Sequence, residues 1–510
     1  MKKILALFCG ILLTLNAAFA DRVWINDLRT RFLNNSASIL EVNLRSLNVI
    51  DTDNDGLIKK EEGEETGNFL NGIPRLDAIS VYGVNTILLM PINQIGKVKA
   101  LGTAGSLYAV SDLSKINPQL VSKETIMTDI EQAKKFVREA HNRNIRVMVD
   151  LPAFGAYDLY MKCPELFAKD GNGLAIIPDN YTDVRLFNAG TEAAYNKDLF
   201  EFYKGFVDLM LELEVDGIRA CLPSTKPASF WHDLIDYSRK YDAQMLWVAE
   251  ASDSPKNIAN CTTNTPVDKL LDAGFDGYYG FFNNFNDIKN AKDFTNKFTA
   301  LRNSLNKKEN KKAVLGAFST HDDLSPILSK GMPFSIMSFW LGATLPINTH
   351  ILDGTQSGDN YVYSWGNKKA TISETDDLQY FVNRGKIDLF NYSRKPGANN
   401  MLILGEFVKS VQFKNYFSKQ LNAGTFNFVK TTHPDMFAYV ISYNRTAILV
   451  IGNINFNSHA KGDVKLPKFT EEHISVPVRI MEPPIASKGQ LSTTLAPGEI
   501  QILIISDYEL

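Results

Sequence analysis

The chain has 510 residues, a formal net charge of −3 and 22% charged residues. So small a negative charge, with no run of lysine and arginine, does not support nucleic-acid binding. The length exceeds that of one ordinary domain and suits a large barrel followed by one smaller domain.

The N-terminus has the pattern of a cleavable export signal. Lys2 and Lys3 precede an apolar run from Ile4 to Leu15, and the small-residue site Ala18-Phe19-Ala20 follows. We therefore expect residues 1–20 to be a signal peptide and the mature chain to be secreted or periplasmic. The alternative, a membrane anchor, requires about 20 apolar residues and is less favoured. No later segment is apolar enough to span a membrane.

The cysteine count does not fit a closed disulfide framework. Of the four cysteines, Cys9 would leave with the signal peptide, so that Cys163, Cys221 and Cys261 remain. An odd number leaves at least one thiol free or paired between chains. Their pairing stays open.

The middle of the chain alternates strand and helix patterns. Ile39 to Leu47 alternates apolar and polar residues, whereas Thr86 to Met90 is almost wholly apolar, as in a strand buried on both faces. Helical spacing covers residues 70–81, 128–142, 197–214 and 230–241, and further strands are expected at 145–151, 216–221, 245–250 and 313–318. This repetition predicts an α/β fold, a parallel (β/α)8 TIM barrel over residues 21–420.

Two segments depart from this repeat. Residues 152–190 have little periodicity and are expected to form a small excursion after the third strand. After about residue 420 the pattern changes to short alternating strands without helices, at 437–443, 446–453, 476–481 and 499–506. Such strands predict a C-terminal antiparallel β-sandwich over residues 421–510.

Residues at the carboxyl ends of parallel barrel strands converge on one pocket. Those ends carry carboxylates on separate strands with an arginine and a histidine, and a pair of carboxylates with such neighbours makes up a sugar-cleaving site. The candidates are Asp150, Arg219, Cys221, Glu250, His321 and Asp322.

The motifs around these residues resemble the α-amylase superfamily (glycoside hydrolase family 13) in order and spacing. The matching segments are ILEVNLRSLN, residues 72–92, SLYAVSDLSKINP, VMVDLPAFG, GIRAC, WVAE and FSTHD. The resemblance implies an α-glucan or oligosaccharide ligand. It implies Glu250 as acid/base, Asp322 as transition-state stabiliser, and substrate binding by Tyr108, Asp150, Arg219 and His321.

The departures from the family pattern concern the same site. Cys221 stands where the family has its nucleophilic aspartate, and Phe154 and Gly155 replace a polar asparagine and histidine. A thiol with an ordinary pKa of about 8.5 is mostly neutral at pH 7, and a neutral thiol cannot stabilise a cationic transition state. Arg219 could favour the thiolate, which leaves a cysteine nucleophile as an alternative.

The loop DTDNDGLIKKEE, residues 51–62, matches the twelve-residue EF-hand calcium template. The expected Ca²⁺ ligands are Asp51, Asp53, Asp55, the Leu57 carbonyl and Glu62. Many members of the resembled family carry an acidic calcium loop after the first strand. The alternative is a solvated acidic turn.

Three functional hypotheses follow. The chain is an exported, calcium-binding relative of the α-amylases that binds α-glucan with little or no hydrolysis. Alternatively, it is an active hydrolase or transglycosylase that uses Glu250 with an unusual nucleophile. In the third hypothesis the pocket has closed and the role is structural or one of protein interaction.

Overall fold

In the computed structural model, eight parallel strands close into a barrel. The structure describes residues 24–53, 58–178, 181–253, 258, 261, 263–360, 363–364, 381–382, 390, 392, 399–466, 473–475, 485–487 and 489–506. In chain order the barrel strands are β1 (Ser38–Val42), β2 (Thr86–Leu89), β5 (Arg146–Leu151), β8 (Gly217–Ala220), β9 (Leu246–Ser252), β10 (Gly277–Gly280), β11 (Ala313–Ala317) and β12 (Asn348–Leu352). The predicted barrel is therefore confirmed. The expected signal peptide lies outside the described residues.

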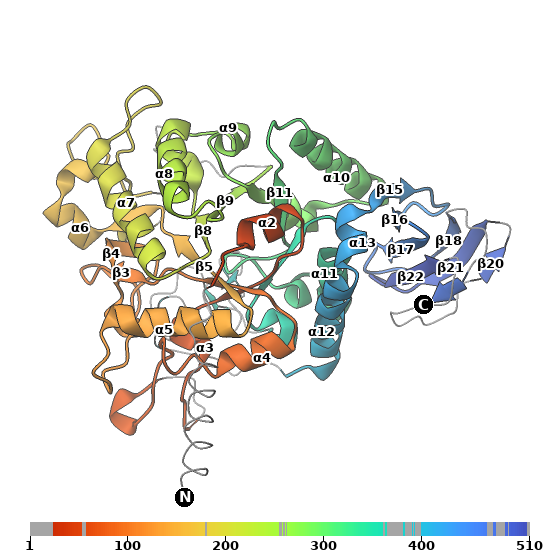
Figure 1. The fold of residues 1–510 in the computed structure, drawn as a ribbon, viewed down its shortest axis with the longest axis horizontal. Coiled ribbons are helices and arrows are strands. Elements are labelled where there is room, and N and C mark those ends of the chain that lie inside the picture. Colours follow the sequence, from red (N-terminus) through yellow and green to blue (C-terminus); the bar gives the residue numbers. More distant parts are fainter. Residues whose placement is uncertain are drawn as a thin grey trace, which may run out of the picture.

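Helices surround the barrel (Figure 1). They are α2 (Leu28–Leu33), α4 (Arg75–Val81), α5 (Asp129–Asn142), α7 (Lys197–Glu212), α8 (Ala228–Tyr241), α9 (Val267–Asp272), α10 (Ala291–Asn306), α11 (Pro326–Thr344), α12 (Met401–Tyr416) and α13 (Ser418–Ala423). Local sequence explains their starts. At α5, for example, Thr128 and Glu131 form a reciprocal capping box.

The prediction for the first strand, which ran to Leu47, was too long. The observed strand β1 ends at Val42, because the Asn43 side chain accepts a hydrogen bond from the Arg45 N–H and caps the short helix α3 (Leu44–Leu47). Asparagine is a favoured N-cap residue, so this local signal overrides the alternating pattern.

The excursion after the third barrel strand is part of a larger unit. It contributes the helix α6 (Tyr157–Lys162) and the strands β6 (Phe154–Ala156) and β7 (Val184–Arg185). These two strands join β3 (Asn93–Ile95) and β4 (Ala109–Ile116) in one sheet. The segment after the second barrel strand and the excursion therefore form this side sheet together.

The C-terminal region forms two antiparallel sheets, which lie at one end of the molecule in Figure 1. The larger contains β15 (Thr425–Val429), β16 (Met436–Tyr443), β17 (Thr446–Asn453), β22 (Ile500–Ser506) and β19 (His473–Ser475). The smaller contains β18 (Ala460–Lys465), β21 (Gln490–Leu495) and β20 (Ile485–Ser487). The predicted antiparallel C-terminal domain is confirmed, although the strand expected at 476–481 lies outside the described residues.

The barrel and the C-terminal sheets share a continuous apolar core. The Phe294 ring from α10 lies 5.0 Å from that of Phe437. The hydroxyl groups of Thr344 and Tyr439 are 2.6 Å apart. Because polar and apolar contacts both cross this boundary, we expect the two regions to unfold together.

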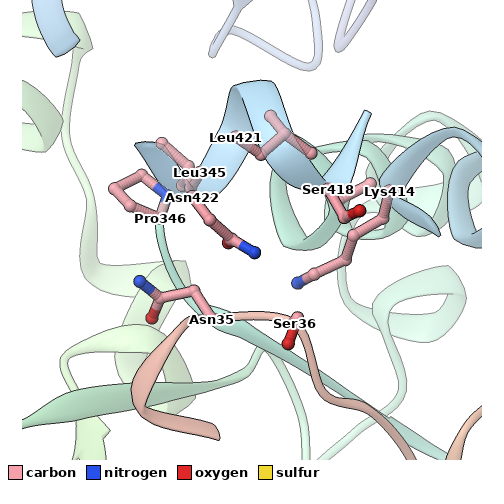
Figure 2. A pocket seen from close by; sticks show the side chains of 9 residues that line it. Asn35, Ser36, Leu345, Pro346, Lys414, Ser418, Leu421 and Asn422 are labelled. Atoms are coloured by element: carbon pink, nitrogen blue, oxygen red, sulfur yellow. The ribbon is translucent and has the colours of Figure 1, made fainter. Parts of the chain in front are cut away.

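A shallow hollow of about 230 Å³ lies near the amino ends of β1 and β12, and Figure 2 shows its lining residues. Lys414 is buried there. Its ammonium donates to the Gly342 and Ile347 carbonyls and to the Thr349 hydroxyl, at 2.9, 2.7 and 3.0 Å. These three bonds connect α12 to the base of the barrel.

Within the described part of the chain, no helix has the length and apolar character needed to cross a bilayer.

Candidate active site

Arg219 on β8 is the centre of the site. Its guanidinium donates to Asp150 Oδ2 at 2.7 Å and lies 3.4 Å from Glu250 Oε1. It also lies 3.4 Å from the Cys221 sulfur and hydrogen-bonds the Tyr279 hydroxyl. The structure thus brings together the arginine, two carboxyl groups and the thiol that the sequence placed at separate strand ends.

Tyr108 joins this cluster from the loop before β4. Its hydroxyl donates to Asp150 Oδ2 at 2.8 Å, and its ring stacks on His321 with centroids 5.3 Å apart. Asp112, the aspartate of the matching segment SLYAVSDLSKINP, is engaged elsewhere, because it pairs with Lys115 at 2.8 Å. Tyr108 therefore connects the Asp150 and His321 parts of the site.

Cys221 is buried in an apolar cluster. Its neighbours in that cluster come mainly from the side sheet and the adjoining loops: Ala109, Ala153, Phe154, Ala156, Val184 and Leu186. Burial, together with the negative charges of Asp150, Glu250 and Asp322, raises the pKa of the Cys221 thiol well above its ordinary value, although Arg219 opposes this. The thiol is consequently protonated at neutral pH, and burial outweighs the effect of Arg219. Cys163, Cys221 and Cys261 are all free thiols.

The two positions that replace polar family residues are also enclosed. Phe154 belongs to the apolar cluster around Cys221. A Cβ atom at Gly155 would lie 2.6 Å from Phe167 Cζ and 2.8 Å from Phe187 Cζ. The surroundings of position 155 therefore exclude any side chain.

An open hollow of about 620 Å³ lies beside the buried cluster. Its lining includes both expected catalytic acids and several residues that the sequence motifs did not single out. Its polar lining residues are Ser224, Glu250, Ser252, Thr265, Tyr279, Asn283, Thr320, Asp322 and Asp323. Tyr279 lies in β10, whose four residues were too few to give a periodic signal.

Leu222 helps to orient Glu250. Its backbone adopts a left-handed conformation, with φ of +39°, which is rare for a residue with a bulky side chain. In this conformation the Leu222 N–H donates to Glu250 Oε2 at 3.2 Å. Strain of this kind persists where the surrounding structure holds it, and it commonly marks functional sites.

The acidic loop after β1 places three carboxylates together. The side-chain oxygens of Asp51, Asp53 and Glu64 include atoms that all lie within 4.8 Å of one another. Glu62 instead is half exposed and lies 3.9 Å from Lys59 Nζ, which also pairs with Asp53 at 2.8 Å. The other expected ligands, Asp55 and Leu57, lie outside the described residues.

Glu64 was not expected as part of this cluster, because it falls two residues after the twelve-residue template. Its carboxylate accepts hydrogen bonds from the N–H groups of Lys59 and Thr52, at 2.8 and 2.7 Å. These bonds lower the pKa of Glu64, so that its carboxylate is ionised at neutral pH. Three carboxylate oxygens at this spacing fit a hard divalent cation.

Comparison with known proteins supports the fold. The chain matches no protein-family profile. An α-1,4-glucan:maltose-1-phosphate maltosyltransferase of Salinibacter ruber is 24% identical over 424 residues, which cover 77% of this chain and 58% of the relative. Isoamylase 1 of Oryza sativa is 25% identical over 259 residues, covering 48% of this chain and 31% of the relative. The chain thus spans less than two thirds of the curated relatives it matches.

Solved structures match over nearly the whole chain. A maltogenic α-amylase of Thermotoga neapolitana is 19% identical with a TM-score of 0.67, over 94% of this chain and 100% of that one. An α-amylase of Lactobacillus plantarum is 18% identical with a TM-score of 0.66, over 92% and 99%. With its closed barrel and C-terminal antiparallel sheets, the chain shares the fold of these α-amylases.

Proposed function

We propose that this protein binds uncharged α-glucan oligosaccharides in the hollow beside Glu250 and Asp322, and that it hydrolyses them little or not at all. The observation that carries this proposal is the buried, protonated thiol of Cys221 at the nucleophile position. The maltosyltransferase and amylase likenesses support the carbohydrate class of the ligand.

The expected loss of hydrolysis follows from the absence of a negative charge at position 221. A retaining glycosidase needs a carboxylate nucleophile about 5 to 5.5 Å from its acid, to bond with or stabilise a cationic sugar. A neutral thiol supplies neither charge nor a good nucleophile. Removal of one preorganised electrostatic group typically lowers kcat about 10²- to 10³-fold. Loss of a full charge at the reacting centre is expected to exceed this range.

Retained binding is supported by the polar lining of the hollow. Ser224, Glu250 and Asp322 are among its lining residues, and their side chains can hydrogen-bond the hydroxyl groups of a sugar.

The lining favours an uncharged sugar over a sugar phosphate. Three carboxylates, those of Glu250, Asp322 and Asp323, border the hollow, and none of its described lining residues is a lysine or arginine. Arg219 lies behind them in ion pairs with Asp150 and Glu250. A maltosyl phosphate, the donor named for the maltosyltransferase relatives, would bring its phosphate close to these carboxylates.

Calorimetric titration beside a hydrolysis assay tests the proposal. Maltooligosaccharides are expected to bind with little release of reducing ends, and maltose 1-phosphate to bind more weakly than maltose. Asp322→Asn should weaken binding, whereas Asp77→Asn on the outer helix α4, where the side chain is 67% exposed, should not. Robust wild-type turnover that Cys221→Ser abolishes would establish the active-enzyme alternative. Absence of any binding would favour the closed-pocket alternative.

We also propose that Ca²⁺ binds the loop of residues 51–62, with Asp51, Asp53 and the neighbouring Glu64 as carboxylate ligands. A cation that binds only the folded state stabilises it by about 2.7 kcal/mol at 100 times its Kd. Calcium should therefore raise the melting temperature relative to chelator. Asp51→Asn should remove the shift. Glu62→Gln should leave the shift unchanged if the observed cluster with Glu64 binds the ion, and should remove it if the ligands are those of the sequence template. Equal melting temperatures in calcium and chelator would contradict the proposal.

Export to the periplasm or medium is proposed from the signal pattern in residues 1–20. Expression of the full chain with its own N-terminus in a bacterium, followed by N-terminal sequencing, tests it. The expected mature terminus is Asp21. A protein that keeps residues 1–20 in the cytoplasmic fraction would contradict export.

A further inference from the structure

Glu41 on β1 is a buried carboxylate clamped between two histidines. Its Oε1 accepts from His321 Nδ1 at 2.7 Å, and its Oε2 lies 3.2 Å from His350 Nε2. Glu41 is 0% exposed, and His321 and His350 are 4% and 1% exposed. The sequence motifs did not single out Glu41 or His350.

This arrangement is not explained by the barrel fold alone. A fully buried carboxylate is unfavourable unless it is paired and hydrogen-bonded. His350 lies on β12, directly beside Ile39 of β1 in the strand register, and His321 follows β11. Glu41 therefore connects three strands that are neighbours in the barrel, β1, β12 and β11. The three side chains do not form a metal cluster, because in the described chain only Asp51, Asp53 and Glu64 have three ligand atoms mutually within 4.8 Å.

The bond to Glu41 determines which way His321 faces. With Nδ1 held by Glu41, the other ring nitrogen Nε2 lies 3.7 Å from Asp322 Oδ1, and Asp322 lines the hollow. Stacking on Tyr108, at an interplanar angle of 24°, restricts rotation of the His321 ring. The imidazole thus spans from a buried carboxylate to the wall of the proposed sugar site.

We propose that Glu41 is a positioning residue that holds His321 protonated on both nitrogens, with Nε2–H directed toward Asp322 as a donor to a sugar hydroxyl. The sugar-binding part rests on the proposed function, whereas the orientation and protonation of His321 do not. A carboxylate behind a histidine commonly fixes the tautomer and orientation of the ring in this way.

The charges around His321 support this state. Burial would lower the pKa of His321, but the negative charges of Asp322 and Glu41 and the hydrogen bond that His321 donates to Glu41 raise it to about 9. Arg219 opposes the rise, Tyr108 faces the ring as a neutral phenol, and His350 lies on the far side of Glu41. Burial alone would also raise the pKa of Glu41, but the two histidines hold it well below its ordinary value.

Glu41→Gln keeps the shape of the side chain and removes its charge. In protein labelled with ¹³C- and ¹⁵N-histidine, the His321 signal, identified by its loss in His321→Gln, should titrate near pH 9 in the wild type. In Glu41→Gln it should titrate at distinctly lower pH. At pH 7.5 the wild-type signal should show both nitrogens protonated.

Glucan titration between pH 6 and 10 adds a functional readout. Wild-type affinity should fall about tenfold as His321 deprotonates, as expected for loss of a charged donor. In Glu41→Gln the same fall should occur at lower pH, with near-wild-type affinity at pH 6. His350→Gln is the matched control, because His350 contacts Glu41 but not Asp322, and its His321 titration should shift less.

An unchanged His321 titration in Glu41→Gln would overturn the proposal, as would a neutral wild-type ring at pH 7.5. A uniform loss of affinity at every pH would indicate a merely structural role and would also overturn it. If Glu41→Gln fails to fold, the proposal is still tested by the His321 titration in Glu41→Asp and by the protonation state of His321 in the wild type at pH 7.5. If no glucan binds to the wild type, the proposed function fails while the histidine signals continue to test the role of Glu41.

Discussion

Restoring a carboxylate at the nucleophile position should destabilise this protein rather than reactivate it. In Cys221→Asp the new carboxyl group would occupy a position that is 5% exposed and lies in an apolar cluster. The charges of Asp150, Glu250 and Asp322 all act against a negative charge there. Arg219, which would attract it, is already paired with Asp150 and Glu250.

The magnitude follows from the cost of burying a group without adequate compensation, about 2 to 5 kcal/mol. Because the barrel and the C-terminal sheets are expected to unfold together, the cooperative unit is about 490 residues with an unfolding entropy near 1 kcal/mol/K, so that each kcal/mol lowers the melting temperature by about 1 °C. We therefore expect Cys221→Asp to melt about 2 to 5 °C below the wild type at pH 7.

The pH dependence has a definite sign. Burial raises the pKa of the introduced carboxyl group above its unfolded value of about 3.9, so the folded variant binds the extra proton. The variant is therefore closest to the wild type near pH 4 and loses stability as the pH rises toward 7. Thermal melts from pH 4 to 8 test this, with Cys221→Ser as the uncharged control.

The outcome that would refute this reasoning is equally specific. Cys221→Asp that melts like the wild type at pH 7 and hydrolyses maltooligosaccharides at a substantial rate would mean that the site already accommodates a carboxylate. The apolar surroundings of Cys221 would then not account for the loss of activity. A trace of activity with reduced stability agrees with the prediction.

Two further predictions concern packing. Gly155→His should prevent stable folding or lower the melting temperature by several degrees, because its Cβ would lie 2.6 Å from Phe167. The backbone shifts needed to relieve such a contact cost about 1 to 3 kcal/mol or more. Soluble expression and thermal melting measure this effect, and a variant as stable as the wild type would contradict it. Tyr439→Phe removes the hydroxyl that lies 2.6 Å from that of Thr344 and should destabilise the barrel contact by about 1 kcal/mol. Faster limited proteolysis near the boundary at residues 416–425 measures this loss, and unchanged cleavage would show that the bond contributes little.

The fold was largely predictable because the barrel repeats one pattern. Strands such as Thr86–Leu89 and helices such as Asp129–Asn142 were expected within a few residues of their observed bounds. The sixth and eighth strands, Gly277–Gly280 and Asn348–Leu352, had no clear pattern. Four- or five-residue strands that are buried on both faces show neither alternation nor helical spacing, so that only closure of the barrel identifies them.

The candidate site was predictable where a sequence motif marks the end of a strand. It was not predictable where the site depends on a contact between strands that are distant in the chain. Asp150, Arg219 and Glu250 were all identified from the sequence, and the structure joins them through one guanidinium. Glu41 and His350 were missed, because no motif singled them out and each shares its short strand with other polar residues. Their pairing depends on strands that lie more than 300 residues apart in the chain but adjacent in the barrel.

The sequence by itself determined the class of fold, the order of its parts and the chemical identity of position 221, because these depend on local periodicity and on residue type. It did not determine the protonation of the Cys221 thiol. Arg219, two residues away, favours the thiolate, but burial against the side sheet has the larger effect and keeps the proton in place. The tertiary structure decided the charge of this group, because desolvation depends on segments that meet only in the folded chain.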